Sequence, residues 1–383
     1  MALALGAVPA MGATLTTLHA FGTGLTEGTM PGGTLVLRSG ILYGTTQSGG
    51  AAGFYGTLFK TKASTGATST LYNFVGKPDG SNPQNGVIFY NGLLYGTNYL
   101  NGMHNGGDVF AINPATGAET LVYNFIGGSD GIFPHAGVTL AGTQLYGTTN
   151  GGGGASSGTV YRLDPATGQE TVLYRFSGGA DGREPAAAPL YSGGSLYGTA
   201  QGGGSFALGV IYRVNTTSHA ESTLYSFAGQ PDGRYPLGTL AMLNGNLYGI
   251  TPSGGDANLG VVFQFNTRTG TMTILHSFAG GSDGAYPLAG LTLVNGVFYG
   301  TTSAGGGADC GGTGCGTLFS IVPATSAETV LASFAPTAAA PTLGATPFGP
   351  LLYAAGVFYG TTAAGGGTGC GGAGCGSIFK FTP

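Results

Sequence analysis

Apolar and polar residues alternate along short segments that recur through the whole chain. Between residues 131 and 176, four segments are apolar, aromatic or β-branched at every second position: 136–140, 144–149, 159–163 and 171–176. Stretches rich in Gly, Pro, Asn and Asp separate them, and no stretch of helical length repeats every 3.6 residues. Such alternation between turn residues is typical of β-strands. The pattern predicts an all-β fold with four antiparallel strands in each unit.

The second strand of each unit carries the motif Leu/Phe-Tyr-Gly, followed in most copies by Thr. Subtracting successive numbers of its seven tyrosines gives steps of 52, 51, 51, 51, 51 and 60 residues for Tyr43, Tyr95, Tyr146, Tyr197, Tyr248, Tyr299 and Tyr359. A period near fifty residues indicates a repeat architecture. Seven such units predict one seven-bladed β-propeller over residues 14–383, in which each blade buries its faces against both neighbours. We expect these tyrosines, and the Phe of each fourth strand, to pack between blades.

The two ends of the chain predict how the ring closes. Residues 15–21 fit the pattern of a fourth strand, whereas residues 376–381 fit that of a third, so the last unit lacks its own fourth strand. We therefore predict that Thr14–Phe21 pairs with Ser377–Phe381. Residues 1–13 are small and apolar, and Ala10-Met11-Gly12 resembles a cleavage site, so they are either the remnant of a signal peptide or a tail.

Charge and hydropathy exclude some classes of partner. Only 7% of the residues are charged and the net charge is −4, without a run of Lys or Arg. Phosphate backbones bind basic surfaces, so we expect no nucleic-acid partner. No apolar run reaches the roughly 18 residues that a membrane span needs. The 79 glycines do not indicate disorder, because 20 Tyr and 21 Phe recur in register with them.

The repeat also resembles a known family. Tyr-Gly-Thr-Thr, then a Gly-rich loop, then Gly-Thr-Val-Tyr or Gly-Thr-Leu-Phe, is similar to bacterial tandem-repeat proteins of the GloVer type, which often carry varied C-terminal surface anchors. The resemblance covers nearly the whole chain. It implies a secreted or cell-surface bacterial protein and implies no activity; no anchor segment is found in this sequence.

All four cysteines lie in two Gly-rich loops of neighbouring units. Four small residues separate the members of each pair, so Cys310–Cys315 and Cys370–Cys375 can each close a small loop as a disulfide. The alternative is a metal site with four thiolates. An extracellular location favours the disulfides.

The loops that lead from a fourth strand to the next unit carry Asp-Gly-x-x-Pro. The aspartates are Asp79, Asp130, Asp181, Asp232 and Asp283, and two further loops deviate. One interpretation is that each carboxylate caps its own turn, which explains why it recurs. The other is a ring of carboxylates near the central channel that holds a hard cation such as Ca²⁺. We favour the first and expect no other cofactor.

The residues around these prolines differ between units, which makes them candidate ligand-binding residues. They are Phe133, His135, Arg183, Glu184, Arg234, Tyr235 and Tyr286, in consecutive junctions where they could form one patch beside the channel mouth. Aromatic rings stack on sugars, and Arg forms paired hydrogen bonds with uronate carboxylates. The alternative is ordinary variation in solvated loops.

Three functions follow from this surface. The first is a secreted or cell-surface binding or scaffolding protein for a polysaccharide. The second is a polysaccharide lyase, with Tyr235 or His135 as base and Arg183 or Arg234 neutralising a uronate. The third is a structural protein that self-associates. Propellers serve all three purposes, so the fold does not decide between these functions. It also does not decide whether the chain is an enzyme.

Other reactive side chains form no recognisable catalytic set. Beyond the turn aspartates, the carboxylates that could serve glycoside hydrolysis are scattered: Asp108, Glu184, Asp256 and Asp309. The histidines lack zinc-protease spacing. His19 and His276 stand where other units have a fourth-strand Tyr, so we expect them to pack. Glu119, Glu170, Glu221 and Glu328 recur at one turn and are expected to be structural.

Overall fold

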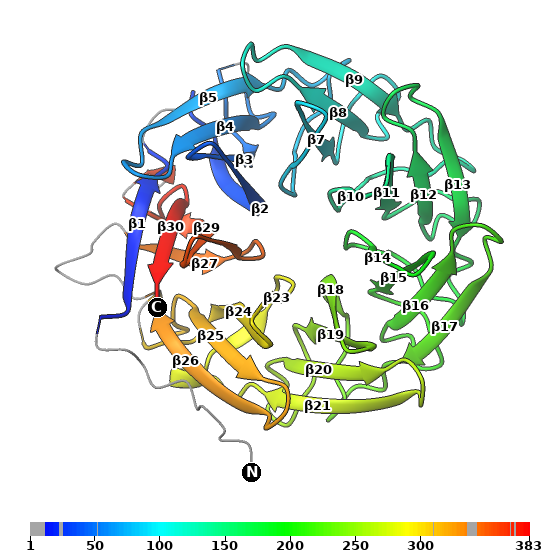
Figure 1. The fold of residues 1–383 in the computed structure, drawn as a ribbon, viewed down its shortest axis with the longest axis vertical. Coiled ribbons are helices and arrows are strands. Elements are labelled where there is room, and N and C mark those ends of the chain that lie inside the picture. The colour runs from blue at the N-terminus through cyan, green and yellow to red at the C-terminus, as the bar shows by residue number, and fades with distance from the viewer. Residues whose placement is uncertain are drawn as a thin grey trace.

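The computed structural model describes residues 12–22, 26–51, 53–308, 310–334, 343–367, 369–370 and 373–383. Its strands form seven antiparallel sheets that stand around a ring, each with one strand edge towards the centre and the opposite edge outside (Figure 1). The described residues contain no α-helix, and a 3₁₀ turn, η1 (Gly281–Asp283), precedes blade 6. The predicted seven-bladed propeller is confirmed.

Each blade follows the predicted order from the innermost to the outermost strand. Blade 1 contains β2 (Thr29–Arg38), β3 (Ile41–Ser48), β4 (Thr57–Lys62) and β5 (Thr68–Asn73). Blade 2 contains β6 (Ile88–Tyr90), β7 (Leu93–Asn98), β8 (Asp108–Ile112) and β9 (Glu119–Asn124). Blade 3 contains β10 (Thr139–Ala141), β11 (Gln144–Thr149), β12 (Thr159–Leu163) and β13 (Glu170–Arg175). Blades 4 and 5 contain β14 (Leu190–Ser192), β15 (Ser195–Ala200), β16 (Val210–Asn215), β17 (Glu221–Ser226); and β18 (Leu237–Leu243), β19 (Asn246–Thr251), β20 (Val261–Asn266), β21 (Thr271–Ser277).

The innermost strand is split in two in the last two blades. Blade 6 contains β22 (Ala285–Pro287), β23 (Thr292–Val294), β24 (Val297–Ala304), β25 (Thr317–Val322) and β26 (Ala327–Ser333). Blade 7 contains β27 (Gly344–Pro347), β28 (Leu352–Ala354), β29 (Val357–Gly365), β30 (Ser377–Thr382) and, as its outermost strand, β1 (Thr14–Ala20).

The first strand closes the ring as predicted. β1 runs antiparallel to β30 from Thr14 opposite Thr382 to Ala20 opposite Ser377, and the two lie side by side in Figure 1. The amide of Phe21 extends the pairing by donating to the carbonyl oxygen of Gly376 at 2.9 Å. Pairing of the first and last strands removes the open edges that a stack of blades would leave.

The glycine of the repeated motif makes room for an aromatic ring. Gly147 pairs with Tyr161 and Gly249 with Phe263 across the second and third strands. A Cβ atom on Gly147 would lie 2.3 Å from the Tyr161 hydroxyl oxygen, so the ring lies directly over the glycine backbone. The same pairing joins Gly44 to Phe59, Gly96 to Phe110, Gly198 to Tyr212, Gly300 to Phe319 and Gly360 to Phe379.

A fourth-strand Phe from the preceding blade packs on each of these rings. Phe125 meets Tyr161 edge-on with ring centroids 5.2 Å apart, and Phe227 meets Phe263 at 5.4 Å. Contacts of this kind contribute about 0.5–1.5 kcal/mol beyond the burial of area. The tyrosine of the motif also packs between blades, as Tyr248 does on Phe298 at 4.4 Å. Both predicted classes of packing residue are therefore confirmed.

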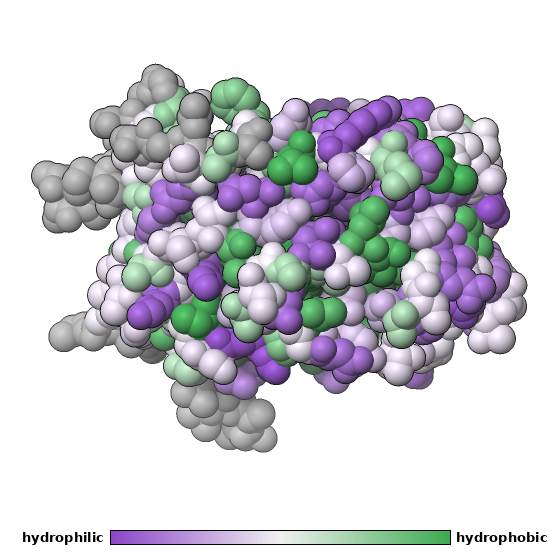
Figure 2. All heavy atoms as spheres, turned by 90° about the horizontal axis from the view of Figure 1, so that it is seen from above, coloured by the Kyte–Doolittle hydropathy of each residue, from purple (hydrophilic) through white to green (hydrophobic). Residues whose placement is uncertain are grey.

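The threonine after the glycine joins neighbouring blades near the channel. The hydroxyl of Thr45 donates to the Asn85 carbonyl at 2.7 Å, and that of Thr148 to the Ala187 carbonyl at 3.1 Å. The whole motif thus serves packing between blades. On the rim seen in Figure 2, hydrophobic residues are scattered in small groups among hydrophilic ones.

Candidate functional site

Two sets of loops form one face of the disc, as the sequence predicted. Residues of the junctions between blades pair with the loop between the second and third strands of the following blade, as Ile132 does with Gly151 and Arg183 with Gly202. We call the surface formed by the junctions and these loops the loop face.

The junction aspartates cap their own turns. The Asp79 carboxylate accepts the amide of Val75 and the hydroxyl of Tyr72, both at 2.9 Å. Asp130 and Asp232 make the same two bonds, and Asp181 adds the hydroxyl of Ser177. Because the tyrosine belongs to the outermost strand, these carboxylates lie at the outer side of the blades. The geometry is that of the turn interpretation and does not gather them at the channel.

Two histidines replace the tyrosine in this motif. His276 Nε2 lies 3.0 Å from Asp283 Oδ1, and His19 Nε2 lies 2.8 Å from Glu27 Oε1. Both rings also pack edge-on against a Phe, as expected, but sequence reasoning missed the carboxylate partner. The signal was available, since Tyr or His stands seven residues before Asp in five junctions.

A second carboxylate faces the turn aspartate from the next blade. Glu119 interacts with Asp79, and Glu170 with Asp130. Burial, reinforced by the neighbouring Asp, raises the pKa of Glu119 to about 7 and that of Glu170 to about 8. These glutamates lie between the blades in structural positions, as predicted, and their raised pKa values keep them partly protonated near pH 7.

The glutamate pairs predict that stability falls as pH rises from about 5 to 8. The folded chain keeps protons on Glu119 and Glu170 that the unfolded chain, with a pKa near 4.3, has already lost. This contribution is complete below pH 4.3 and disappears as pH passes the raised pKa values. Denaturant unfolding at several pH values should show the decline, and Glu119→Gln/Glu170→Gln should flatten it. An equal slope in the double variant would contradict the assignment.

The second residue between the Gly and Pro of each junction has a left-handed backbone. Its φ is 61° at Phe133, 58° at Glu184, 57° at Tyr235 and 56° at Tyr286, and Met30, Asn82 and Thr346 share the conformation. The conformation lets the amide reach the preceding blade, as Tyr235 N does to the Leu208 carbonyl at 2.8 Å. The backbone bond is common to all seven junctions, so the side chain is free to vary. Tyr235 and Tyr286 are 42% and 43% exposed.

The two candidate arginines each lie beside one of these side chains. Arg183 Nε is 3.9 Å from Glu184 Oε1, and about half of each side chain is exposed, so the pair is weak. The Arg234 guanidinium carbon lies 5.5 Å from the centre of the Tyr235 ring. Neighbouring junctions therefore present an arginine with a carboxylate and an arginine with an aromatic ring.

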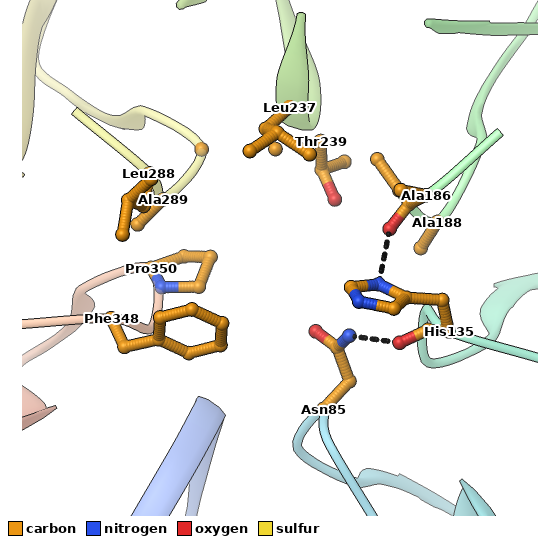
Figure 3. A pocket seen from close by; sticks show the side chains of 13 residues that line it. Asn85, His135, Ala186, Ala188, Leu237, Thr239, Leu288, Ala289, Phe348 and Pro350 are labelled. Carbon is orange, nitrogen blue, oxygen red and sulfur yellow. Dashed lines mark hydrogen bonds between the residues drawn. The ribbon is translucent and has the colours of Figure 1, made fainter. Parts of the chain in front are cut away.

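His135 faces the central channel. It lines a cavity with Asn85, Ala186, Thr239 and Phe348, and neither arginine is among the lining residues (Figure 3). Its Nδ1 is 3.2 Å from the Ala186 carbonyl, and burial lowers its pKa, so the ring is neutral near pH 7. Sequence reasoning missed Tyr99, whose ring contacts both Phe133 at 5.3 Å and His135 at 5.6 Å.

The scattered carboxylates do not assemble into a hydrolytic pair in the described residues. Asp108 is wholly buried and accepts a hydrogen bond from Asn98 at 2.9 Å, whereas Glu184 is exposed. Asp164 caps its own turn through the amide of Ala166. Asp309 lies outside the described residues, as do residues 1–11 of the predicted tail.

Both predicted disulfides are present. Cys310 bonds to Cys315 and Cys370 to Cys375, with Cα atoms 5.4 and 5.3 Å apart. This excludes a site of four thiolates. The carbonyls of Cys315 and Cys375 accept the amides of Thr346 and Met30, so the disulfides brace the two junctions without the Asp-Gly-x-x-Pro sequence.

The fold and its repeated junctions define a closed propeller built from tandem copies of one sequence unit. Residues 6–158 and 128–314 match the model of the Gloeobacter/Verrucomicrobia repeat, and the chain belongs to this family. The resemblance seen in the sequence is thereby confirmed. No curated protein matches the sequence.

Solved structures share the fold at low identity. An oligogalacturonate lyase in complex with manganese is 11% identical, with 97% of this chain and 96% of that one covered and a TM-score of 0.57. An oligogalacturonate lyase from Vibrio parahaemolyticus is 9% identical, with 97% of each chain covered and a TM-score of 0.53. At this identity the likeness extends to the fold alone. In the described residues, no helix has the length and apolar character needed to cross a bilayer.

Proposed function

We propose that the chain is a secreted or cell-surface binding protein that holds a polysaccharide on the loop face between blades 2 and 6. The observation that carries this is the run of bulky left-handed residues at four consecutive junctions: Phe133, Glu184, Tyr235 and Tyr286. A left-handed backbone costs a non-glycine residue about 1–2 kcal/mol, and this cost is smallest for Gly and Asn. The fold uses only the backbone amide at these positions. Exposed aromatic side chains on a strained backbone there point to a role in recognition.

The chemistry of the patch favours an acidic polysaccharide. Exposed tyrosine rings offer flat apolar surfaces for sugars, and Arg183 and Arg234 offer paired N–H donors for uronate carboxylates. Two further exposed apolar side chains on this part of the loop face would extend the contact along a long ligand: Ile126 and Phe206. The channel is a poorer site, because Ala, Gly, Leu and Pro dominate its lining.

Binding without turnover is favoured over the lyase alternative. The likeness to oligogalacturonate lyases is one of fold, and neither arginine lines the cavity that His135 lines. Tyr235 beside Arg234 is the remaining candidate for a base next to a uronate-binding group. Product detection is therefore part of the test.

A glycan array that includes polygalacturonate, followed by calorimetry, tests the proposal. We expect Tyr235→Asn to weaken binding at least about tenfold while keeping or raising stability, because Asn82 is the natural residue at an equivalent position. Arg183→Ala/Arg234→Ala should do the same for acidic glycans only. Arg268→Ala, in an exposed turn between β20 and β21 on the opposite face, is the matched control.

Three results would contradict the proposal. Unsaturated uronate products would establish the lyase. Silence across the array together with ordered self-assembly would establish the structural role. Binding that survives in the tyrosine and arginine variants would place the glycan elsewhere.

A further inference from the structure

We propose that the junction between blades 5 and 6 is a binding site for a divalent transition metal of the Zn²⁺ class, formed by His276, Asp283 and Glu328. The donor atoms of these three residues lie within 4.8 Å of one another. One imidazole nitrogen with two carboxylate oxygens is a donor set that suits Zn²⁺ and related ions, whereas Ca²⁺ and Mg²⁺ prefer oxygen alone.

The three donors come from three elements on two blades. His276 lies on β21, the outermost strand of blade 5, and Asp283 ends η1. Glu328 lies on β26, the outermost strand of blade 6. The Asp283 carboxylate is already oriented, because its second oxygen accepts the Ala279 amide at 2.6 Å and leaves the first oxygen beside His276 Nε2. A hydrogen bond of this kind holds a carboxylate ligand in place.

Other junctions show what is particular about this one. Where Glu119, Glu170 and Glu221 face a turn Asp, the third group is the hydroxyl of Tyr72, Tyr123 or Tyr174, which donates a hydrogen bond to that Asp. His19 brings an imidazole beside Glu27, but the residue equivalent to Glu328 in blade 1 is Thr68. At the junction of Asp232 the equivalent residue is Met272. Among the described junctions, only that of His276 combines all three metal-binding groups.

The electrostatics of the cluster favour a cation. Glu328 and Asp283 are like charges held together at the blade interface. Glu328 Oε1 is buried without a hydrogen-bond partner, as are Glu119 Oε1 and Glu170 Oε1, but among the described residues only Glu328 has both an imidazole and a carboxylate beside it. A bound cation would satisfy this oxygen and neutralise the repulsion. All three residues are partly exposed, so an ion has a path of entry.

A metal at this site would link two blades. It would bind the folded ring and not the unfolded chain, so the melting temperature would rise with the logarithm of the Zn²⁺ concentration once that exceeds the Kd. Its remaining coordination positions would face solvent and could accept water or a ligand.

Calorimetry and thermal unfolding on the full chain, without a histidine tag and stripped by a chelator, test the site with Zn²⁺ alone. We expect one Zn²⁺ per chain and a higher melting temperature. His276→Tyr and Glu328→Met introduce the residues found at equivalent positions of other blades, so both should keep the metal-free melting temperature. Each should weaken Zn²⁺ binding at least about tenfold, in line with the loss of one ligand of three.

His19→Tyr is the matched control, because it removes the other His–carboxylate pair, and it should leave Zn²⁺ binding unchanged. The proposal fails if Zn²⁺ neither binds nor stabilises the wild-type chain, or if His276→Tyr and Glu328→Met bind it as the wild type does. An equal response to Ca²⁺ would also overturn it, since the imidazole would then have no part in binding. None of these outcomes depends on whether the loop face binds a glycan.

Discussion

Replacing Phe21 with Ala is expected to destabilise the folded chain by about 3–5 kcal/mol, the usual cost of emptying a buried phenylalanine site. Phe21 is 1% exposed and meets Phe59 of blade 1 edge-on at 5.2 Å. It follows β1, which is held in blade 7 by its pairing with β30. At this junction the ends of the chain must find one another without a covalent connection, so the loss acts on the closure of the ring. Denaturant unfolding followed by circular dichroism measures it.

Two controls separate closure from general damage. Phe54→Ala removes a ring that is 71% exposed and should change stability by less than about 0.5 kcal/mol. Phe206→Ala, which removes a ring that is 58% exposed, should likewise change stability little. If Phe21→Ala unfolds like the wild type, β1 does not hold the ring, and the closure inferred from the two ends of the sequence is wrong.

The fold could be predicted because every strand signal occurs seven times. A single short segment such as 139–141 would be ambiguous, but seven copies in register fix its place in the unit. The missing fourth strand of the last unit and the unpaired first strand then leave one arrangement. The packing of Tyr248 and Phe227 between blades followed from the same repetition, since an aromatic residue that recurs once per blade must meet the next blade.

The candidate site was predictable only in part, for two physical reasons. A left-handed backbone is normally indicated by Gly or Asn in the sequence, so the residue type of Tyr235 or Tyr286 does not indicate it. Contacts such as Glu119 with Asp79 cross between blades, and a repeat period does not say which faces meet. His135 was grouped with the arginines because it follows the Pro of an equivalent junction. Beyond Pro134 the chain turns into the channel, and His135 lines the cavity there.

The turn aspartates were the part of the surface that sequence reasoning read correctly. Asp79 recurs because Val75 and Tyr72 recur with it, which is what a local hydrogen-bonding role produces. A position that is identical in nearly all units describes the unit. A position whose residue type varies between junctions while its backbone conformation stays the same, such as that of Tyr235, indicates a role of the individual junction.

Replacing Gly249 with Ala is the second large effect we expect, with a loss of about 1–3 kcal/mol or more from overpacking. The new methyl carbon would lie 2.5 Å from Phe263 Cζ and 2.8 Å from Leu240 Cδ2. Both neighbours are buried in the same core, and Phe227 of the preceding blade packs edge-on against the Phe263 ring with centroids 5.4 Å apart. The ring therefore has little room to move away, so the strain is shared between two blades.

A double-mutant cycle identifies the cause of this loss. Phe263→Leu alone leaves a void and is destabilising, but it removes the ring that the methyl group strikes. Gly249→Ala/Phe263→Leu should therefore cost less than the sum of the two single changes. Gly179→Ala, in an exposed loop where the nearest atom is the Ser177 hydroxyl oxygen at 3.4 Å, should be nearly neutral. Additive single effects would mean that the aromatic ring does not require this glycine. The repeated Tyr-Gly motif would then need a different explanation.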